Sequence, residues 1–506
     1  MTYLILTVTV LGTIGVFALV VKHTLLSDDQ TRRMYWRTRC RLRPGKGFAT
    51  IWEIQFHHGR MAAVMQGKRV RPTWTFLMRL MANPTEYAIR CGRAQWMRRI
   101  YSPAEDQTVI LSPPRQGKTG VLGDRIAEHP GPAIVAESRS DAYFATVGVR
   151  QQRGPVEVFN PIGISRIPST FKWAICQGCE SPREAVLRAT DLVGAIADGE
   201  MAWWTEKAST ALAAALHAAA VLNADMGDVW AWSNGYAPQM ITEGRKTPGA
   251  SLELFGALAE LDKPGKTADS IRLTMSKSLA WLAIPEIRNM VTGPAAKPFD
   301  VARFVRSNGT IYLMSGGDND PCAPLFRCFT GYMHRASGDY GLALPHRKLD
   351  PGLLIAIDEL HACPVDLPSW LADSAGKGIQ VVAVVHSTGQ LITKYGEDGM
   401  RTVWDTAGTK MFLPGIQDAK TLEDVSKLCG HTHDDRLLPN CPPEYLRQLP
   451  NGWMLLLRTN RPPVATKFRP HWKRHAHGMD LAPVLTMPSL TAPGTVTEEV
   501  TSDATA

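Results

Sequence analysis

The sequence predicts an α/β protein whose parallel sheet is interrupted by an all-helical insertion and preceded by one membrane-spanning helix. Three observations favour this fold class. Short apolar runs alternate with helical segments, one long stretch lacks this alternation, and the N-terminal segment is apolar and uncharged. The length of 506 residues exceeds what one hydrophobic core usually holds, so two or three domains are expected.

Seven short apolar runs predict the strands of the sheet. They lie at residues 109–111, 133–135, 156–159, 310–314, 353–357, 381–385 and 410–413. Uninterrupted Val, Ile and Leu indicates strands that are covered on both faces, whereas a half-exposed strand alternates apolar and polar residues. Helical segments separate the runs, and crossover helices of this kind join parallel strands. The sheet is therefore predicted to be parallel.

Strand signals stop between about residues 176 and 307, where Ala-rich and Leu-rich helical segments follow one another. One helical face collects Trp204, Ala208, Leu212, Ala215, Leu216 and Ala219. Apolar residues at this spacing indicate a helix that packs on one side. This stretch is predicted to be an all-α domain inserted into the α/β domain.

The N-terminal segment 3–21 is predicted to be an uncleaved membrane anchor. It contains no charge, and as a helix it would be roughly 28 Å long at about 1.5 Å per residue, close to the hydrocarbon thickness of a bilayer. Lys22 follows at once, and six arginines and a lysine lie within 32–46. Basic flanks stay in the cytoplasm, so we expect a single-pass protein of the inner membrane with most of its chain in the cytoplasm. A cleaved signal peptide is the alternative, but the first three residues supply no basic side chain.

Composition narrows the class of protein without deciding it. The net charge of +9 fits a nucleic acid or anionic lipid partner, but it is also ordinary for a membrane protein with a basic flank. The nine cysteines are scattered, which indicates reduced thiols rather than a disulfide framework. Cys176 and Cys179 have the spacing of half a zinc site, but no second pair of ligands accompanies them, so no metal site is predicted there.

A phosphate-binding loop is predicted directly after the strand at 109–111. The strand–loop–helix context is that of a P-loop, or Walker A motif, in which backbone amides and a helix N-terminus hold phosphates. Ser112 replaces the first glycine of the pattern with another small residue. Lys118 is predicted to reach the β- and γ-phosphates of ATP, and the Thr119 hydroxyl to bind Mg²⁺. The predicted nucleotide-binding loop comprises Ser112, Pro113, Pro114, Arg115, Gln116, Gly117, Lys118, Thr119 and Gly120.

Two acids, Asp358 and Glu359, follow the five apolar residues 353–357. A solvated turn is the alternative, but a turn does not normally follow five buried residues. In open α/β sheets the ligand crevice lies outside the carboxyl ends of the strands, so acids placed there face it. As in a Walker B motif, Asp358 is predicted to hold Mg²⁺, and Glu359 to orient and deprotonate the attacking water. Lys118 and Glu359 are thus the predicted catalytic residues of an ATPase with a P-loop (RecA-like) domain.

Further motifs follow in a fixed order along the chain. They are Glu137-Ser138-Arg139-Ser140-Asp141 and Phe159-Asn160-Pro161 after two strands, Trp203-Trp204 in the helical insertion, and Gly378-Ile379, His386-Ser387, Gln390-Leu391 and Tyr395-Gly396 after the acids. In this order and spacing the chain resembles the TraG/TraD-type coupling proteins, the VirD-like coupling ATPases of conjugation and type IV secretion. The resemblance covers most of residues 48–472.

The resemblance implies a function and a set of partners. The protein would recruit relaxase-bound single-stranded DNA to a type IV secretion or conjugation channel and drive its transfer by ATP hydrolysis. It would form a ring of six subunits beneath the membrane, with ATP sites between neighbours and with channel components as partners. Two alternatives remain: a nucleotide-binding receptor or scaffold without motor activity, and a related translocase for duplex DNA or protein effectors.

Three departures from the family pattern concern the site and the anchor. His386 stands where the family has a glutamine that senses the γ-phosphate; it is predicted to bind nucleotide because it can still donate a hydrogen bond, and a structural histidine is the alternative. The family's arginine before Gly378 has no clear counterpart, and Lys377 is a weaker substitute for it. One predicted membrane span stands where many relatives have two.

These features divide the chain into six segments. They are the membrane anchor at 1–22, a basic juxtamembrane region at 23–102, the first part of the nucleotide-binding domain at 103–175, the all-α domain at 176–307, the second part of the nucleotide-binding domain at 308–481, and a disordered tail at 482–506.

Overall fold

The computed structural model describes residues 47–94, 98–194, 200–235, 246–261, 265–317, 320–360, 365–431 and 439–473. The predicted anchor at 1–22, the basic segment at 23–46 and the predicted tail at 482–506 lie outside these ranges. Within them, no helix is both long and apolar enough to cross a bilayer.

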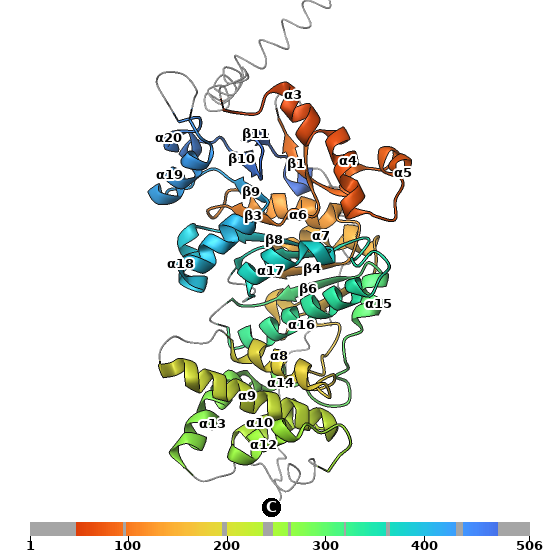
Figure 1. Ribbon diagram of the computed structural model, residues 1–506, viewed down its shortest axis with the longest axis vertical. Coiled ribbons are helices and arrows are strands. Elements are labelled where there is room, and N and C mark those ends of the chain that lie inside the picture. The colour runs from red at the N-terminus through yellow and green to blue at the C-terminus, as the bar shows by residue number, and fades with distance from the viewer. Residues whose placement is uncertain are drawn as a thin grey trace, which may run out of the picture.

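The strands of the described ranges join one sheet of eleven, in the order β2-β1-β11-β10-β9-β3-β8-β7-β4-β6-β5 (Figure 1). Seven neighbours in this sheet are parallel: β9 (Thr409–Phe412), β3 (Thr108–Leu111), β8 (Ile379–Val385), β7 (Leu353–Ile357), β4 (Ala133–Glu137), β6 (Thr310–Met314) and β5 (Val156–Phe159). They coincide with the seven apolar runs of the sequence, and the predicted parallel sheet is confirmed.

Four antiparallel strands extend the sheet beyond β9, and the sequence does not predict them. They are β10 (Trp453–Arg458), β11 (Val464–Lys467), β1 (Ala88–Arg93) and β2 (Arg99–Pro103). β1 reads Ala-Ile-Arg-Cys-Gly-Arg, and its arginines and glycine obscure the apolar pattern of a strand. Because β1 pairs with β11, the segment before residue 103 is part of the same sheet as the parallel strands.

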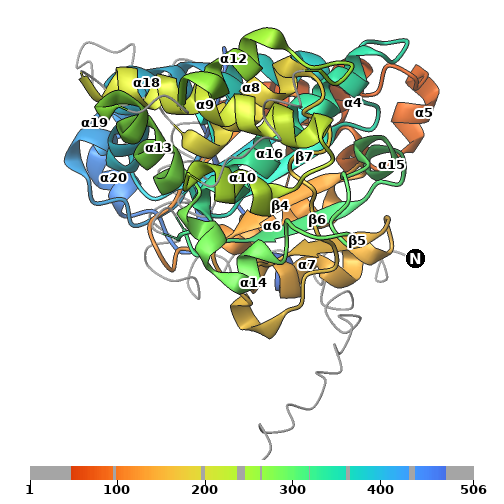
Figure 2. The same ribbon diagram turned by 90° about the horizontal axis from the view of Figure 1, so that it is seen from below.

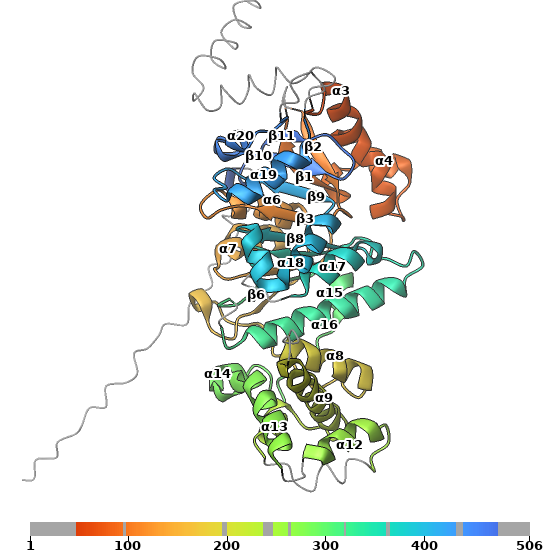
Figure 3. The same ribbon diagram turned by 60° about the vertical axis from the view of Figure 1, so that its left-hand side comes forward.

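Helices cover both faces of the parallel strands, and Figure 3 shows α6 and α7 on one side with α16 and α17 on the other. These helices are α6 (Lys118–Glu128), α7 (Asp141–Gln151), α16 (Ala323–Leu342), α17 (Leu367–Asp373) and α18 (Thr388–Thr406). Successive residues of a strand enter different cores: Ile110 packs in one core with Leu122 of α6, and Val109 in the other with Phe329 of α16. The sheet is thus buried on both faces.

Between β5 and β6 the described chain is helical. It contains α8 (Pro182–Val193), α9 (Glu200–Val221), α10 (Met226–Ser233), α12 (Leu252–Leu261), α13 (Lys266–Ser278), η5 (Ala280–Ala283), α14 (Pro285–Arg288) and α15 (Val301–Arg306). Ala208, Leu212 and Leu216 of α9 are fully buried beneath its neighbours. Figures 1 and 2 show α9, α10, α12 and α13 stacked at one end of the molecule.

Short helices complete the described chain. They are α3 (Ile51–Glu53), η1 (Ile54–His58), α4 (Arg60–Val70), α5 (Phe76–Met81), η2 (Pro84–Glu86), η4 (Ile164–Arg166), η7 (Ala375–Lys377), α19 (Ala419–Leu428), α20 (Pro443–Arg447) and η8 (His471–Lys473). In Figure 1 the helices α3, α4 and α5 lie at the end opposite to the helical insertion.

Candidate nucleotide-binding site

The predicted P-loop lies at the carboxyl end of β3, in the middle of the eleven-stranded sheet. The chain turns from strand to helix through two residues in the left-handed region, Arg115 at φ 64° and Gly117 at φ 86°, and α6 then begins at Lys118. Ser112 is not one of these two left-handed residues. It is buried, and its N–H donates to the carbonyl of Val385 at 2.9 Å. A serine is therefore compatible with the loop, since no left-handed conformation is required of it.

Lys118 and the two acids meet although about 240 residues separate them in the chain. Lys118 Nζ donates to the carbonyl oxygen of Asp358 at 3.2 Å, and it lies 3.7 Å from Asp358 Oδ2 and 3.9 Å from Glu359 Oε2. The order β3-β8-β7 explains the approach, because only one strand separates the two carboxyl ends.

Thr119 and Asp358 supply two oxygen ligands of the kind that Mg²⁺ prefers. Thr119 Oγ1 lies 3.5 Å from Asp358 Oδ1. Burial raises the pKa of Asp358, against the opposing charge of Lys118, so a cation nearby would stabilise its ionised form. Among the described residues no group of three or more His, Cys, Asp or Glu is arranged to hold a metal ion. Two protein oxygens are compatible with Mg²⁺, because water and nucleotide phosphates usually supply the other ligands of this ion.

Glu359 is held by three polar neighbours. Ser138 Oγ donates to Oε2 at 2.9 Å, and His386 Nε2 lies 3.2 Å from Oε1. The hydrogen bond from His386, with smaller contributions from Ser138 and Lys118, lowers the pKa of Glu359 to about 2 despite partial burial. In this state the carboxylate is ionised and a weak base.

His386 links the P-loop to Glu359. Its Nδ1 lies 2.9 Å from the carbonyl oxygen of Ser112, and its Nε2 faces the Glu359 carboxylate. Both partners are acceptors, so the protonated ring, in which both nitrogens donate, is the form that satisfies both contacts. The hydrogen bond with Glu359 accordingly raises the pKa of His386. Its main-chain N–H donates to Gln390 Oε1 at 2.9 Å, which fixes the strand end.

Two residues at the end of β4 belong to the site although the sequence assigns them no role. Ser138 orients Glu359, as described above, and Glu137 is fully buried. The Glu137 carboxylate accepts from the N–H groups of Ala142 at 2.9 Å and Tyr143 at 3.0 Å, in the first turn of α7. Burial raises the pKa of Glu137 well above its ordinary value. The sequence signal for Glu137 and Ser138 was their position at the end of a predicted strand. The sequence does not reveal, however, that β4 neighbours β7.

The remaining predicted residues lie further from the acids. Pro113, Pro114 and Arg115 form the outer part of the loop, and the Gln116 side chain lies against Gly415, after β9. Lys377, the substitute for the family's arginine, lies at the amino end of β8 and pairs with Asp373. Within one chain it is therefore at the other edge of the sheet from the P-loop.

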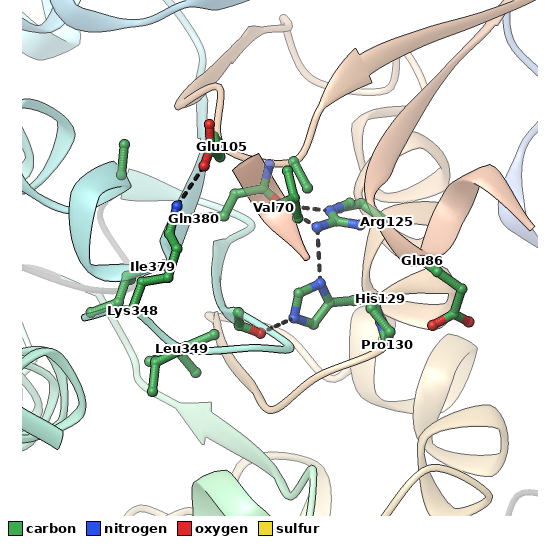
Figure 4. A pocket seen from close by; sticks show the side chains of 15 residues that line it. Val70, Glu86, Glu105, Arg125, His129, Pro130, Lys348, Leu349, Ile379 and Gln380 are labelled. Carbon is green, nitrogen blue, oxygen red and sulfur yellow. Dashed lines mark hydrogen bonds and ion pairs between the residues drawn. The ribbon is translucent and has the colours of Figure 1, made fainter. Parts of the chain in front are cut away.

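A small cavity also lies at that other edge, where β7 and β8 begin (Figure 4). Arg125 and His129, from the last turn of α6 and the residue after it, face it; Arg125 Nε donates to Gln380 Oε1 at 2.7 Å, and its Nη2 lies 2.9 Å from His129 Nδ1. The cavity volume of about 30 Å³ accommodates water but no nucleotide.

Comparisons with known proteins agree with this fold. A family model described as the TraM recognition site of TraD and TraG matches residues 352–436, which include both acids and His386. The plasmid coupling protein TrwB in complex with GDPNP has a TM-score of 0.57 at 18% identity, covering 76% of this chain and 90% of that one. TrwB in complex with ADP and Mg²⁺ also has a TM-score of 0.57, at 19% identity, covering 73% and 87%. The predicted resemblance to the TraG/TraD-type coupling proteins is confirmed.

A third TrwB structure, in complex with the ATP analogue ADPNP, has a TM-score of 0.54 at 19% identity and covers 72% of this chain and 86% of that one. No curated protein sequence matches the chain. The chain thus has a TrwB-like fold, at a sequence identity of only 18–19%.

Proposed function

We propose that this protein is a membrane-anchored ATPase of the coupling type, which recruits relaxase-bound single-stranded DNA to a type IV secretion or conjugation channel and drives its transfer. The observation that carries the proposal is the convergence of Lys118, Asp358, Glu359 and His386 at the carboxyl edge of a TrwB-like sheet. These side chains come from three neighbouring strand ends, and together they can bind phosphates and activate water. TrwB itself is known in complex with ADP and Mg²⁺ and with nucleotide analogues.

The contacts among the side chains of the site suggest how hydrolysis is restrained until ATP binds. Lys118 contacts carboxylates that the β- and γ-phosphates would replace, and Glu359 is paired with the His386 imidazolium. When His386 and Lys118 turn to the γ-phosphate, Glu359 loses two stabilising partners and its pKa rises. It then becomes a better base for the attacking water. Mg²⁺, held by Thr119 and Asp358, would neutralise phosphate charge.

The assembly and the membrane anchor are further parts of the proposal. A ring of six would place a neighbour's residue at each ATP site, and Lys377 is the candidate for that position. The anchor at 1–22 is supported by the helices that begin close after residue 46, where Trp52 is 72% exposed and stacks on the exposed Phe56. Exposed aromatic rings that are followed in the sequence by the exposed Arg60 and Lys68 are typical of a segment that lies at a membrane interface.

The matched segment 352–436 also suggests a partner. The family model is described as the TraM recognition site of TraD and TraG. By analogy, part of this segment would bind a protein of the DNA-processing complex. α18 offers a charged exposed surface for this purpose, with Glu397, Asp398 and Arg401.

One assay tests the proposed function. ATP turnover of the full-length protein in lipid nanodiscs is measured alone, with single-stranded DNA, with duplex DNA and with a candidate effector protein, and Lys118→Ala serves as the inactive control. Stimulation chiefly by single-stranded DNA is expected, and DNA binding should weaken steeply as salt rises, because binding releases counterions. Binding of ATP without turnover under all four conditions would support the receptor or scaffold instead, and stimulation only by duplex or effector would support the other translocase.

A further inference from the structure

One face of α6 is lined by glycines, and a segment near the C-terminus lies directly on it. Gly117, which directly precedes α6, and Gly120 and Gly123 within it recur every three residues, which places them on one side of the helix. Glycine inside a helix costs about 0.5–1 kcal/mol relative to alanine, so close packing is the expected reason for it. We call residues 468–473, which pack there, the strap.

The distances show how closely the strap approaches. A Cβ atom on Gly120 would lie 3.1 Å from the ring of Trp472 and 3.1 Å from Pro470 Cβ, and one on Gly123 would lie 3.2 Å from His471 Cβ. At Gly117 a Cβ would lie 3.4 Å from the ring of Phe468. The strap therefore follows the first turns of α6, beginning at the P-loop itself.

Buried contacts fix the strap in this position. Phe468 is buried, and its N–H donates to the carbonyl of Gly452 at 2.9 Å. His471 is fully buried, with Nδ1 3.7 Å from Asp124 Oδ1 on α6 and Nε2 bonded to the carbonyl of Ala145 on α7. Trp472 differs from both, because it is 43% exposed. The strap thus holds the partly exposed ring of Trp472 against Gly120.

We propose that Trp472 stacks on the base of the bound nucleotide. The proposal rests on the proposed ATP site: phosphates held by the loop at 112–119 leave the ribose and base to extend past the start of α6, where the ring of Trp472 contacts Gly120. Base–aromatic stacking depends on the π-face and not on hydrogen bonds to the base edge. The site should therefore accept both adenine and guanine nucleotides and favour purines over the smaller pyrimidines.

The test compares ligands with and without a base. Affinities of the full-length protein for ATP, GTP, CTP and inorganic tripolyphosphate are measured for wild type, Trp472→Ala and Trp472→Phe. Trp472→Ala should weaken ATP and GTP roughly tenfold, CTP less, and tripolyphosphate not at all, while Trp472→Phe keeps most of the affinity. Trp203→Ala is the matched control, because Trp203 is 46% exposed on α9 and should affect none of these ligands.

A second measurement covers the case in which Trp472→Ala does not fold. Energy transfer from tryptophan to a ribose-labelled fluorescent ATP should fall markedly in Trp472→Phe and not in Trp203→Phe. An unchanged ratio of ATP to tripolyphosphate affinity in a folded Trp472→Ala, or unchanged energy transfer in Trp472→Phe, would overturn the proposal. Failure of the proposed ATP site looks different, because the wild type would then bind neither ATP nor tripolyphosphate. A wild type that binds ATP without turnover would fail only as a motor, and the test of Trp472 would still apply.

Discussion

Charged side chains at the two edges of the parallel sheet differ in how far they are buried and in the partners that they contact. At the carboxyl edge, the side chains of Lys118, Glu359 and His386 are 18%, 24% and 26% exposed, and their partners are groups that a nucleotide can replace. At the amino edge, Arg125 and His129 are buried and bonded to fixed groups of the fold. Burial lowers the pKa of both, so shifted pKa values occur at each edge. The candidate site differs from the amino edge because its charged side chains are accessible and a nucleotide can replace their partners. A shifted pKa alone does not distinguish it.

The largest expected effect is at the carboxyl edge. Glu359→Gln keeps the size of the side chain but removes the base, so ATP should bind normally while turnover falls by about 10²–10⁴. Lys118→Ala provides the contrast, because the loss of a phosphate ligand should weaken binding and hydrolysis together. Nucleotide affinity and steady-state turnover are measured for both, and co-expression with wild type tests whether Glu359→Gln is dominant in transfer. Near wild-type turnover of Glu359→Gln would show that another group activates the water.

The matching change at the amino edge should affect stability instead. Arg150 is buried, and it donates to the carbonyls of His129 and Gly131 and to Thr310 Oγ1 at 2.6–2.7 Å. Arg150→Met leaves these acceptors unpaired and should lower the free energy of unfolding by about 3 kcal/mol. The folded fraction should bind ATP as the wild type does.

Denaturant unfolding of the full-length protein, followed by circular dichroism, measures the loss. Arg153→Met is the control, because the side chains of its ion pair with Glu86 are 36% and 23% exposed, and the pair should contribute about 0–1 kcal/mol. Equal free energies of unfolding of the two variants, or a selective loss of ATP affinity in folded Arg150→Met, would contradict the purely structural role of the amino edge.

The same contrast explains what the sequence could and could not predict. Most of the parallel strands are short apolar runs, although β5 reads Val-Glu-Val-Phe and β9 reads Thr-Lys-Met-Phe. Lys118, Asp358 and Glu359 follow apolar runs in recognisable patterns, so most of the strands and both acids can be recognised from the local sequence. The strand order cannot be recognised in this way, because it depends on pairing between distant segments. For this reason Ser138 beside Glu359 and the strap beside Gly120 could not be predicted.

The antiparallel strands escape prediction for a related reason. β1 and β2 together contain three arginines, β2 pairs with β1, and β1 joins the rest of the sheet through β11, which lies more than 350 residues further along the chain. The place of these two strands in the sheet is thus a tertiary effect that local propensity does not contain.

A smaller effect is expected from the pH dependence that His386 confers. Its pKa is raised above the ordinary 6.5, so the ion pair with Glu359 is complete at low pH and is lost as pH rises through the raised value. Loss of the pair frees Glu359 to act as a base. For wild type, kcat/KM should therefore rise several-fold with pH across this range, because this parameter reports groups of the free enzyme. In His386→Gln the rise should be absent, and identical profiles would mean that His386 does not restrain Glu359.

The smallest effect is expected from Ser138, the residue at this edge that the sequence leaves unassigned. Ser138 Oγ donates to Glu359 Oε2 at 2.9 Å, on the side of the carboxylate away from His386. Ser138→Ala removes one of the two hydrogen bonds that orient the base but leaves its charge and its pairing with His386. A positioning role should lower kcat about three- to tenfold with little change in ATP affinity, since misorientation is felt mainly in the transition state. Ser138→Thr keeps a hydroxyl donor and should recover most of the rate, whereas Ser140→Ala, which loses a bond to Ser165 instead, is the control outside the site. If Ser138→Ala and Ser140→Ala turn over ATP alike, the contact with Glu359 only joins β4 to β7, and the carboxyl edge depends on three strand ends rather than four.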